Sequence, residues 1–183
     1  MNEKNFNLSK VKLDPNGGLK AEYQITTVVD DEPSVITRKE SCSRDVHPDL
    51  SDSFKALRQI VGSVFGFTQL LTELDTGEMS AGTKARLKAK IEDQLDKIEV
   101  RGIALSGSEE KAGVIITAIL ETANGTKTCI NTPRIRLESD SFGFEEELQD
   151  CCEAIKTEVY QYLFEGKQAQ LSLFGEQNDM PVA

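Results

Sequence analysis

Apolar and polar residues alternate with a period of two in residues 20–29 and 111–120. This alternation puts the apolar side chains on one face of a pleated strand, so both stretches predict a strand with one buried face. Four shorter strand-like runs flank them, at residues 6–13, 34–41, 97–105 and 126–130. Polar or glycine-containing turns separate the neighbouring strands. A segment with helical spacing follows each group of three strands. The pattern therefore predicts an α+β protein in which helices cover antiparallel sheets.

The first predicted helix begins near Pro48, with Asp49 or Ser51 as its cap. Its apolar stripe consists of Leu50, Phe54, Leu57, Val61 and Val64. The second begins at three glutamates, which suit the positive end of a helix dipole, and Gly166 is expected to end it. Its apolar stripe consists of Phe144, Leu148, Cys151, Ile155, Val159, and Tyr162 or Leu163.

The two halves of the chain resemble each other at a constant spacing. Lys20, Ala21, Ile25 and Thr26 recur as Lys111, Ala112, Ile116 and Thr117, and similar turns flank both segments. We interpret this as duplication of a strand–strand–strand–helix (βββα) unit, each helix covering the apolar face of its own strands. Two such units are expected to pack about a pseudo-twofold axis.

This interpretation divides the chain into four parts. The first βββα unit covers residues 1–67, and a connecting segment with a short predicted helix covers residues 68–96. The second unit covers residues 97–166, and residues 167–183 are expected to form a flexible tail.

Composition and charge narrow the classes of partner. The chain has 183 residues, of which 38% are hydrophobic and 28% charged, and its formal net charge is −10. A negative net charge argues against non-specific wrapping of DNA or binding to an anionic membrane. The N-terminal residues lack the apolar segment of a secretory leader, and the longest apolar stretch is too short to cross a bilayer. We therefore expect a cytoplasmic protein with no membrane partner.

Few residues suit catalysis or metal binding. The four cysteines are not spaced as Cys-x-x-Cys, and His47 is the single histidine, so neither a zinc site nor a disulfide is expected. The sequence also lacks a phosphate-binding glycine loop and a dinucleotide fingerprint. We therefore expect a non-enzymatic protein without a cofactor or metal, although carboxylates converging from separate strands remain an alternative.

Basic residues gather on the predicted strands and their edges. They are Lys10, Lys12, Arg38, Lys39, Arg101, Lys127, Arg134 and Arg136. If helices cover one face of the sheet, the other face can be locally basic and bind nucleic acid. The alternative is an ordinary solvated sheet face, which commonly carries lysine, arginine and threonine.

The clearest motif lies after the second helix, where Gln170, Leu171, Ser172, Leu173 and Phe174 form a partly apolar segment among polar residues. This pentapeptide closely resembles the bacterial sliding-clamp-binding motif, Gln-Leu-[Ser/Asp]-Leu-Phe. Replicative polymerases, mismatch-repair proteins and several phage proteins carry that motif, often in a flexible tail. The resemblance implies that Gln170 is a polar anchor, that Leu171 makes a minor apolar contact and that Ser172 is a spacer. Leu173 and Phe174 would fill the clamp's hydrophobic pocket.

The folded part resembles small uncharacterised phage and prophage proteins. The similarity lies in His47–Leu50, Ala56–Leu57, Ile116–Ala118 and Asn131–Pro133. Together the resemblances imply a non-enzymatic accessory protein of bacterial or phage DNA replication or recombination that binds the sliding clamp.

Three alternatives remain open from the sequence. The chain could be a nucleic-acid-binding factor that uses the basic strand face, with the tail serving only for recruitment. It could also be an acidic phage inhibitor of a host DNA-binding protein, or, less expectedly, an enzyme with carboxylate chemistry. The sequence gives no indication of oligomeric state.

Overall fold

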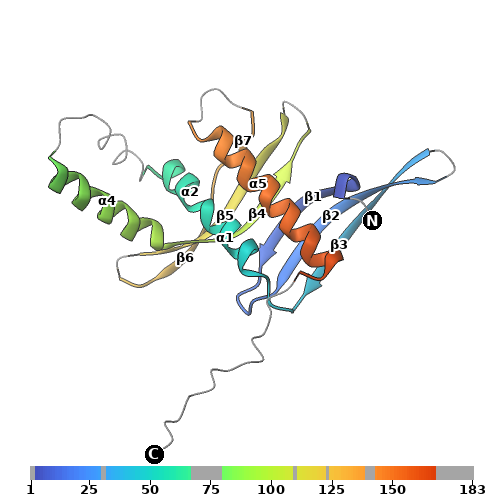
Figure 1. Cartoon of the computed structure of the whole chain (residues 1–183), viewed down its shortest axis with the longest axis horizontal. Coiled ribbons are helices and arrows are strands. Elements are labelled where there is room, and N and C mark those ends of the chain that lie inside the picture. Colours follow the sequence, from blue (N-terminus) through green and yellow to red (C-terminus); the bar gives the residue numbers. More distant parts are fainter. Residues whose placement is uncertain are drawn as a thin grey trace, which may run out of the picture.

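One antiparallel sheet forms the centre of the computed structural model, which describes residues 3–29, 32–66, 80–108, 111–122, 124–138 and 143–167 (Figure 1). Its strands lie in the order β3-β2-β1-β4-β5-β6, and a seventh strand, β7, pairs with β5. Their bounds are β1 Phe6–Leu13, β2 Leu19–Val29, β3 Glu32–Cys42, β4 Ile98–Ser106, β5 Gly113–Glu121, β6 Lys127–Asn131 and β7 Ile135–Arg136. The predicted α+β class is confirmed, and the six predicted strands are present.

Helices lie against one face of this sheet (Figure 1). They are α1 Pro48–Ala56, α2 Arg58–Val64 and α5 Glu145–Tyr160, while α4 Ala81–Asp96 packs beside α2 and β4. A π-helical turn, Gln161–Glu165, continues α5, and a short 3₁₀ turn, Glu3–Asn5, precedes β1. Within the described residues, no helix is long and apolar enough to span a membrane.

Strand alternation decides which side chains face the helices. The helix-covered face buries Val11, Tyr23, Ile103 and Ile116. The residues next to each of them in the same strand point to the other face. A single hydrophobic core contains residues from both halves of the chain. The apolar positions of the strands are therefore sequestered together instead of in two separate cores.

The helices cover the sheet differently from the prediction. Phe164, at the end of the α5 segment, packs its ring against Phe6 of β1 and Tyr23 of β2, while α1 and α2 contact β4. Helices from each half thus contact strands from the other half. The reason is that β1 and β4 are neighbours in one continuous sheet, so the apolar faces of both halves merge.

Three local predictions are corrected at the helices. His47 caps α1, not Asp49 or Ser51, and its Nδ1 accepts a hydrogen bond from the Asp49 backbone N–H at 3.3 Å. The predicted start near Pro48 is confirmed, and because Pro48 occupies the first turn, the cap is the residue before it. A break at Leu57 divides the first predicted helix into α1 and α2. In α5, Cys152 is buried in the core, whereas Cys151 is only half-buried.

Two strand irregularities lie at the centre of the sheet. The register shifts between Leu8 and Lys10 in β1, and between Val100 and Gly102 in β4. Between these bulges, β1 and β4 pair through Val11 and Ile103, flanked by the pairs Lys10–Ala104 and Lys12–Gly102. A bulge adds an unpaired residue and redirects its side chain, which here determines where Arg101 lies.

Candidate functional site

The predicted clamp-binding residues Gln170, Leu171, Ser172, Leu173 and Phe174 lie outside the described residues. The described residues end at Lys167, three positions before Gln170. Gly166 caps the π-helical turn in the left-handed conformation, with φ of 75°, and the Lys167 backbone N–H donates to the Gln161 carbonyl at 3.2 Å. The predicted end of the second helix at Gly166 is therefore confirmed.

Lys167 is held by two carboxylates. Its Nζ lies 2.8 Å from Asp49 Oδ2 and 2.8 Å from Glu158 Oε1, so it joins α1 to α5. The hydrogen bond to Asp49 is the main reason why the pKa of Lys167 is raised, and the same bond lowers the pKa of Asp49. These ion pairs place the start of the tail beside the N-terminus of α1.

One group of metal-ligand side chains comes together among the described residues, and it lies at this position. Potential ligand atoms of His47, Asp49 and Glu158 are all within 4.8 Å of one another. The ammonium of Lys167 bridges the two carboxylates and supplies the positive charge that they need. We therefore interpret this group as an ion-pair network and not as a metal site.

The four cysteines are all free thiols and lie on different elements or at different depths. Burial raises the pKa of Cys152 to about 12, so its thiol is protonated near neutral pH. Cys129 is exposed on β6.

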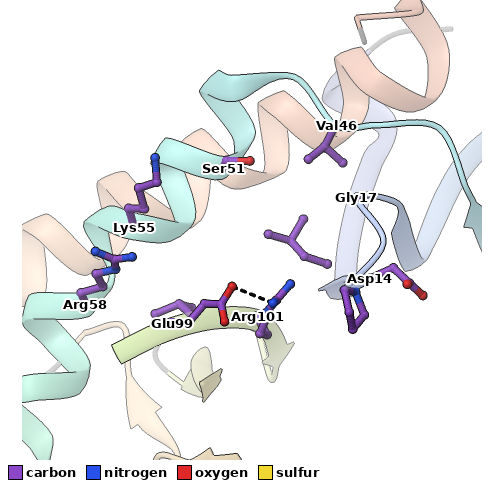
Figure 2. A pocket seen from close by; sticks show the side chains of 11 residues that line it. Asp14, Gly17, Val46, Ser51, Lys55, Arg58, Glu99 and Arg101 are labelled. Carbon is purple, nitrogen blue, oxygen red and sulfur yellow. Dashed lines mark ion pairs between the residues drawn. The ribbon is translucent and has the colours of Figure 1, made fainter. Parts of the chain in front are cut away.

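A cavity of about 440 Å³ lies between the α1–α2 segment and the sheet (Figure 2). Ser51, Lys55 and Arg58 line its helical wall, and Glu99 and Arg101 of β4 line its floor. The remaining lining residues come from the end of β1, the β1–β2 turn, β4 and the loop before α1: Leu13, Asp14, Pro15, Gly17, Val46 and Val100.

Arg101 reaches the cavity because it is the extra residue of the β4 bulge. Its Nη2 lies 2.6 Å from Glu99 Oε1. The bulge also requires Gly102, since a Cβ atom there would lie 2.6 Å from the Val11 carbonyl oxygen. The Nε of Arg101 is buried and has no hydrogen-bond partner within the described part of the chain.

Arg58 is placed similarly on the helical wall. Its Nη1 lies 3.4 Å from Asp96 Oδ1, and its Nε is also buried without a partner among the described residues. Lys55 pairs with Asp52 at 2.6 Å. Each of the three cationic side chains of the lining thus has a carboxylate partner, so the charges around the cavity are largely balanced among the described residues.

The predicted basic residues divide between several surfaces. Lys10 and Lys12 point to the helix-free face of the sheet, where a hollow of about 380 Å³ also involves Lys20 and Lys39. We define these four residues as the lysine group. Lys39 pairs with Glu22 at 3.0 Å and Lys20 with Asp14 at 3.3 Å, while Lys12 lies directly opposite Lys20.

The other predicted basic residues do not join the lysine group. Arg38 lies opposite Tyr23, on the helix-covered side of β3. Arg134 lies in the loop after β6 and donates to the Ser106 carbonyl at 2.9 Å. Lys127 and Arg136 lie on the short strands β6 and β7.

Sequence reasoning missed Lys20, Lys55 and Arg58 as site residues. The alternation in β2 contains the signal for Lys20, because Ala21 and Tyr23 are buried and Lys20 must face the opposite way. Lys55 and Arg58 carried no comparable signal, since exposed cations are ordinary on amphipathic helices.

No protein-family model, curated protein or solved structure matches this chain.

Proposed function

We propose that this chain is a cytoplasmic, non-enzymatic accessory protein of bacterial or phage DNA replication or recombination that binds the sliding clamp through Gln170–Phe174. The observation that carries the proposal is the complete Gln-Leu-Ser-Leu-Phe sequence, which begins four residues after the helix cap at Gly166. In this proposal, Gln170 anchors the peptide at the edge of the clamp's pocket, and Leu173 and Phe174 enter it.

The position of Lys167 supports this proposal. Its ion pairs with Asp49 and Glu158 hold the chain at the surface of the folded part. Three residues of chain span at most about 10 Å, so the segment that joins Lys167 to the pentapeptide is short. A peptide bound in a pocket of the clamp would therefore bring the folded part against the clamp.

Affinity for the clamp would depend on a few anchor side chains that become buried on binding. A flexible peptide loses conformational freedom when it binds, so its affinity must come from side chains that become fully buried. Leu173 and Phe174 each contribute about 1.5–3 kcal/mol when fully buried. Their loss should therefore weaken binding by about 100-fold or more.

The test is a titration of purified bacterial clamp with wild-type protein and with the double variant Leu173→Ala/Phe174→Ala. We expect the double variant to lose clamp binding and to keep the wild-type melting temperature. The matched control is Met180→Ala/Val182→Ala, which shortens two apolar side chains outside the pentapeptide and should retain affinity.

Two results would reject the proposal. One is the absence of wild-type binding at clamp concentrations of about tens of micromolar, well above the dissociation constants of functional peptide contacts. The other is a large fall in the melting temperature of the double variant, which would indicate that Leu173 and Phe174 pack on the folded part instead.

A second candidate function is nucleic-acid binding by the lysine group. Like charges directly opposite each other across two strands repel, as Lys12 and Lys20 do here. Lys12 has no ion-pair partner among the described residues, and Gly102, its neighbour on β4, has no side chain to cover it. A phosphate placed between Lys12 and Lys20 would relieve the repulsion.

Salt dependence tests this second candidate. A single-stranded oligonucleotide should bind with an affinity that falls with salt, and Lys12→Gln/Lys20→Gln should reduce the logarithmic slope by about 0.7 for each lost phosphate contact. The control Lys84→Gln/Lys88→Gln removes two charges from α4 and should leave the slope unchanged. Equal effects of the two variants would argue against a site at the lysine group.

We also propose that the two halves derive from one βββα unit. The apolar, covered positions of β1 are Phe6, Leu8, Val11 and Leu13, and those of β4 are Ile98, Val100, Ile103 and Leu105. Both strands have the same spacing and a bulge at the same point, and the β1–β4 pairing is symmetric about Val11 and Ile103. In an experimental structure, superposing β1–β3 on β4–β6 should align both bulges. An alignment that matches strands in a different order would contradict the duplication.

A further inference from the structure

We propose that two copies of this chain pair through the free edges of their β3 strands and form a symmetric dimer with one continuous sheet. This surface lies in the folded part of the chain and is independent of clamp binding through the tail.

Strand β3 has a long and regular free edge. It lies at one end of the sheet, and β2 is its only strand partner in the part of the chain that the structure describes. Its 11 residues pair with β2 without a register shift. Such an edge leaves alternate backbone N–H and C=O groups unpaired, and they can bind another strand. Proteins often interrupt free edges with bulges, and β3 has none in its pairing with β2.

Part of this edge lies on an arm that projects from the sheet (Figure 1). The pairing of β1 with β2 stops at Phe6 and Ile25. Beyond that point, residues 26–29 of β2 pair with residues 32–35 of β3 and with no other described strand. A two-stranded ribbon is marginally stable by itself in water. A strand added along β3 would therefore stabilise the arm.

Exposed apolar side chains gather on this arm and next to it. Val28 is 72% exposed and Val35 58% exposed, and Ile36 is exposed as well. Among the described residues, Phe65 is the one other large apolar residue with an exposed side chain. The register with β2 puts Val28 and Val35 on the helix-free face. Apolar side chains that gather on a projecting arm indicate a contact with another protein surface.

The charges on β3 select a register for pairing with a second copy. A twofold axis perpendicular to the sheet makes the two β3 strands antiparallel, and directly opposite residues then point to the same face. If Val35 lies opposite its own copy, Glu32 of each strand lies opposite Arg38 of the other. Both residues are exposed, and neither makes an ion pair within the described part of the chain. The neighbour of Arg38 on β2 is the uncharged Tyr23.

The other symmetric registers are less favourable. An axis at Ile36 places Glu32 opposite Glu40 of the other copy. An axis at any charged residue of β3 places that charge opposite its own copy, and like charges directly opposite each other are destabilising. The remaining axes, at the other uncharged residues, bring no opposite charges together. Charge complementarity therefore favours the axis at Val35, which also brings the exposed Val35 side chains of the two copies together.

The symmetry limits the assembly to two copies. Each copy uses the same edge, so the contact is isologous and closes as a dimer. Pairing covers residues 32–38 of each copy, and Pro33 within this segment has no backbone N–H to donate. So short an edge is expected to bury less than the total of about 1,600 Å² in a standard interface. We therefore expect a dissociation constant of about 10–100 µM.

The test is sedimentation velocity of the full chain at concentrations of about 1–500 µM. The wild-type protein should change from monomer to dimer as the concentration rises. Hydrogen exchange locates the contact: backbone amides of residues 33–37 should exchange more slowly at the highest concentration than at the lowest. Amides of β6, at the opposite edge of the sheet, should exchange equally at both.

Charge reversal tests the register. Arg38→Glu and Glu32→Arg each place like charges opposite each other twice in the dimer, so each should weaken dimerisation by at least about tenfold. Glu32→Arg lowers the net negative charge of the chain, so its effect cannot come from general repulsion. The double variant Glu32→Arg/Arg38→Glu exchanges the partners and should restore wild-type affinity.

The matched control is Lys127→Glu on β6, which changes the net charge as Arg38→Glu does and should retain wild-type dimerisation. If Arg38→Glu does not fold, Glu32→Arg decides the question, because Glu32 lies on the arm and outside the core.

Four outcomes would overturn the proposal. The first is a wild-type monomer up to about 500 µM. The second is equal weakening by Lys127→Glu and Arg38→Glu, which would indicate general charge repulsion. The third is a double variant that stays as weak as the single variants, because Glu32 and Arg38 would then not be partners. The fourth is continued growth beyond a dimer, which a twofold contact through one edge does not allow.

Discussion

Two adjacent residues of β4, Arg101 and Gly102, lie at the bulge in the centre of the sheet. Gly102 allows β4 to lie against β1 at the bulge, where any side chain would meet the Val11 carbonyl oxygen. The same bulge turns Arg101 toward the cavity. The pairing of β1 with β4 therefore depends on Gly102, and the lining of the cavity depends on its neighbour Arg101.

Replacing Gly102 with alanine should destabilise the protein by about 1–3 kcal/mol, because the new Cβ would lie 2.6 Å from backbone. Urea denaturation measures this change. Gly82→Ala is the matched control, since it introduces the same methyl group into α4 with no atom within 4 Å. Equal stabilities of the two variants would contradict the close approach.

The buried hydroxyl of Tyr23 should make the protein less stable at alkaline pH. Its hydroxyl donates to Glu40 Oε1 at 2.8 Å, and burial raises its pKa from 10.0 to about 12. A pKa raised on folding means that this contribution is complete below pH 10.0 and is lost as the pH rises through about 12. The difference in unfolding free energy between wild type and Tyr23→Phe should therefore be constant below pH 10.0 and shrink above it. A difference that stays constant up to pH 12 would contradict this assignment.

At the scale of elements, the end of α5 connects the second half of the chain to the first. The ring of Phe164 lies 5.9 Å from Phe6, 5.7 Å from Tyr23 and 5.2 Å from Tyr160, measured between centroids. This cluster closes the core over β1 and β2. The π-helical turn is thus a structural element and also the base from which the tail continues.

Phe164→Ala should lower the unfolding free energy by about 2–4 kcal/mol, because it removes a ring from a cluster of three others. Phe65→Ala is the control, since Phe65 is 42% exposed and its truncation should cost less than about 1 kcal/mol. Chemical denaturation of both variants provides the comparison. A Phe164→Ala loss as small as that of Phe65→Ala would show that the cluster is unimportant for stability.

At the scale of the whole molecule, the sheet and the helices unite both halves in one core. The faces of β1 and β2 are covered by residues of the α5 segment, and β4 is covered by α1 and α2. A fragment that contains one half would expose the apolar face that the other half covers.

Fragments 1–79 and 80–183 should each be largely unfolded when alone and should recover the native circular dichroism spectrum when mixed. The physical reason is that each half lacks the helices that bury part of its strands. The intact chain should unfold in one calorimetric transition. Independent folding of either fragment, or two separated transitions, would contradict a shared core.

The sequence alone determined most of the described elements. Six of the seven described strands lie within two residues of their predicted ends, because a strand with one covered face leaves a pattern of apolar and polar positions. The two-residue strand β7 is too short to leave such a pattern. Helical spacing located α1, α5 and the connecting helix α4, and Gly166 marked the end of the α5 segment because it can adopt positive φ. The pentapeptide Gln170–Phe174 is likewise visible in the sequence alone, because its five residues are consecutive and do not depend on tertiary contacts.

Only the tertiary structure decided how those elements combine. Local patterns do not specify which strands meet, and the pairing of β1 with β4 turned two predicted helix-covered units into one sheet with a common core. The same pairing placed the β4 bulge, and with it Arg101, opposite Arg58 of α2 in one cavity. It also left Lys12 and Lys20 opposite each other on the helix-free face, while Arg38 and Arg134 lie elsewhere. These arrangements depend on contacts between residues far apart in the chain, where the periodicity of a single strand or helix carries no information.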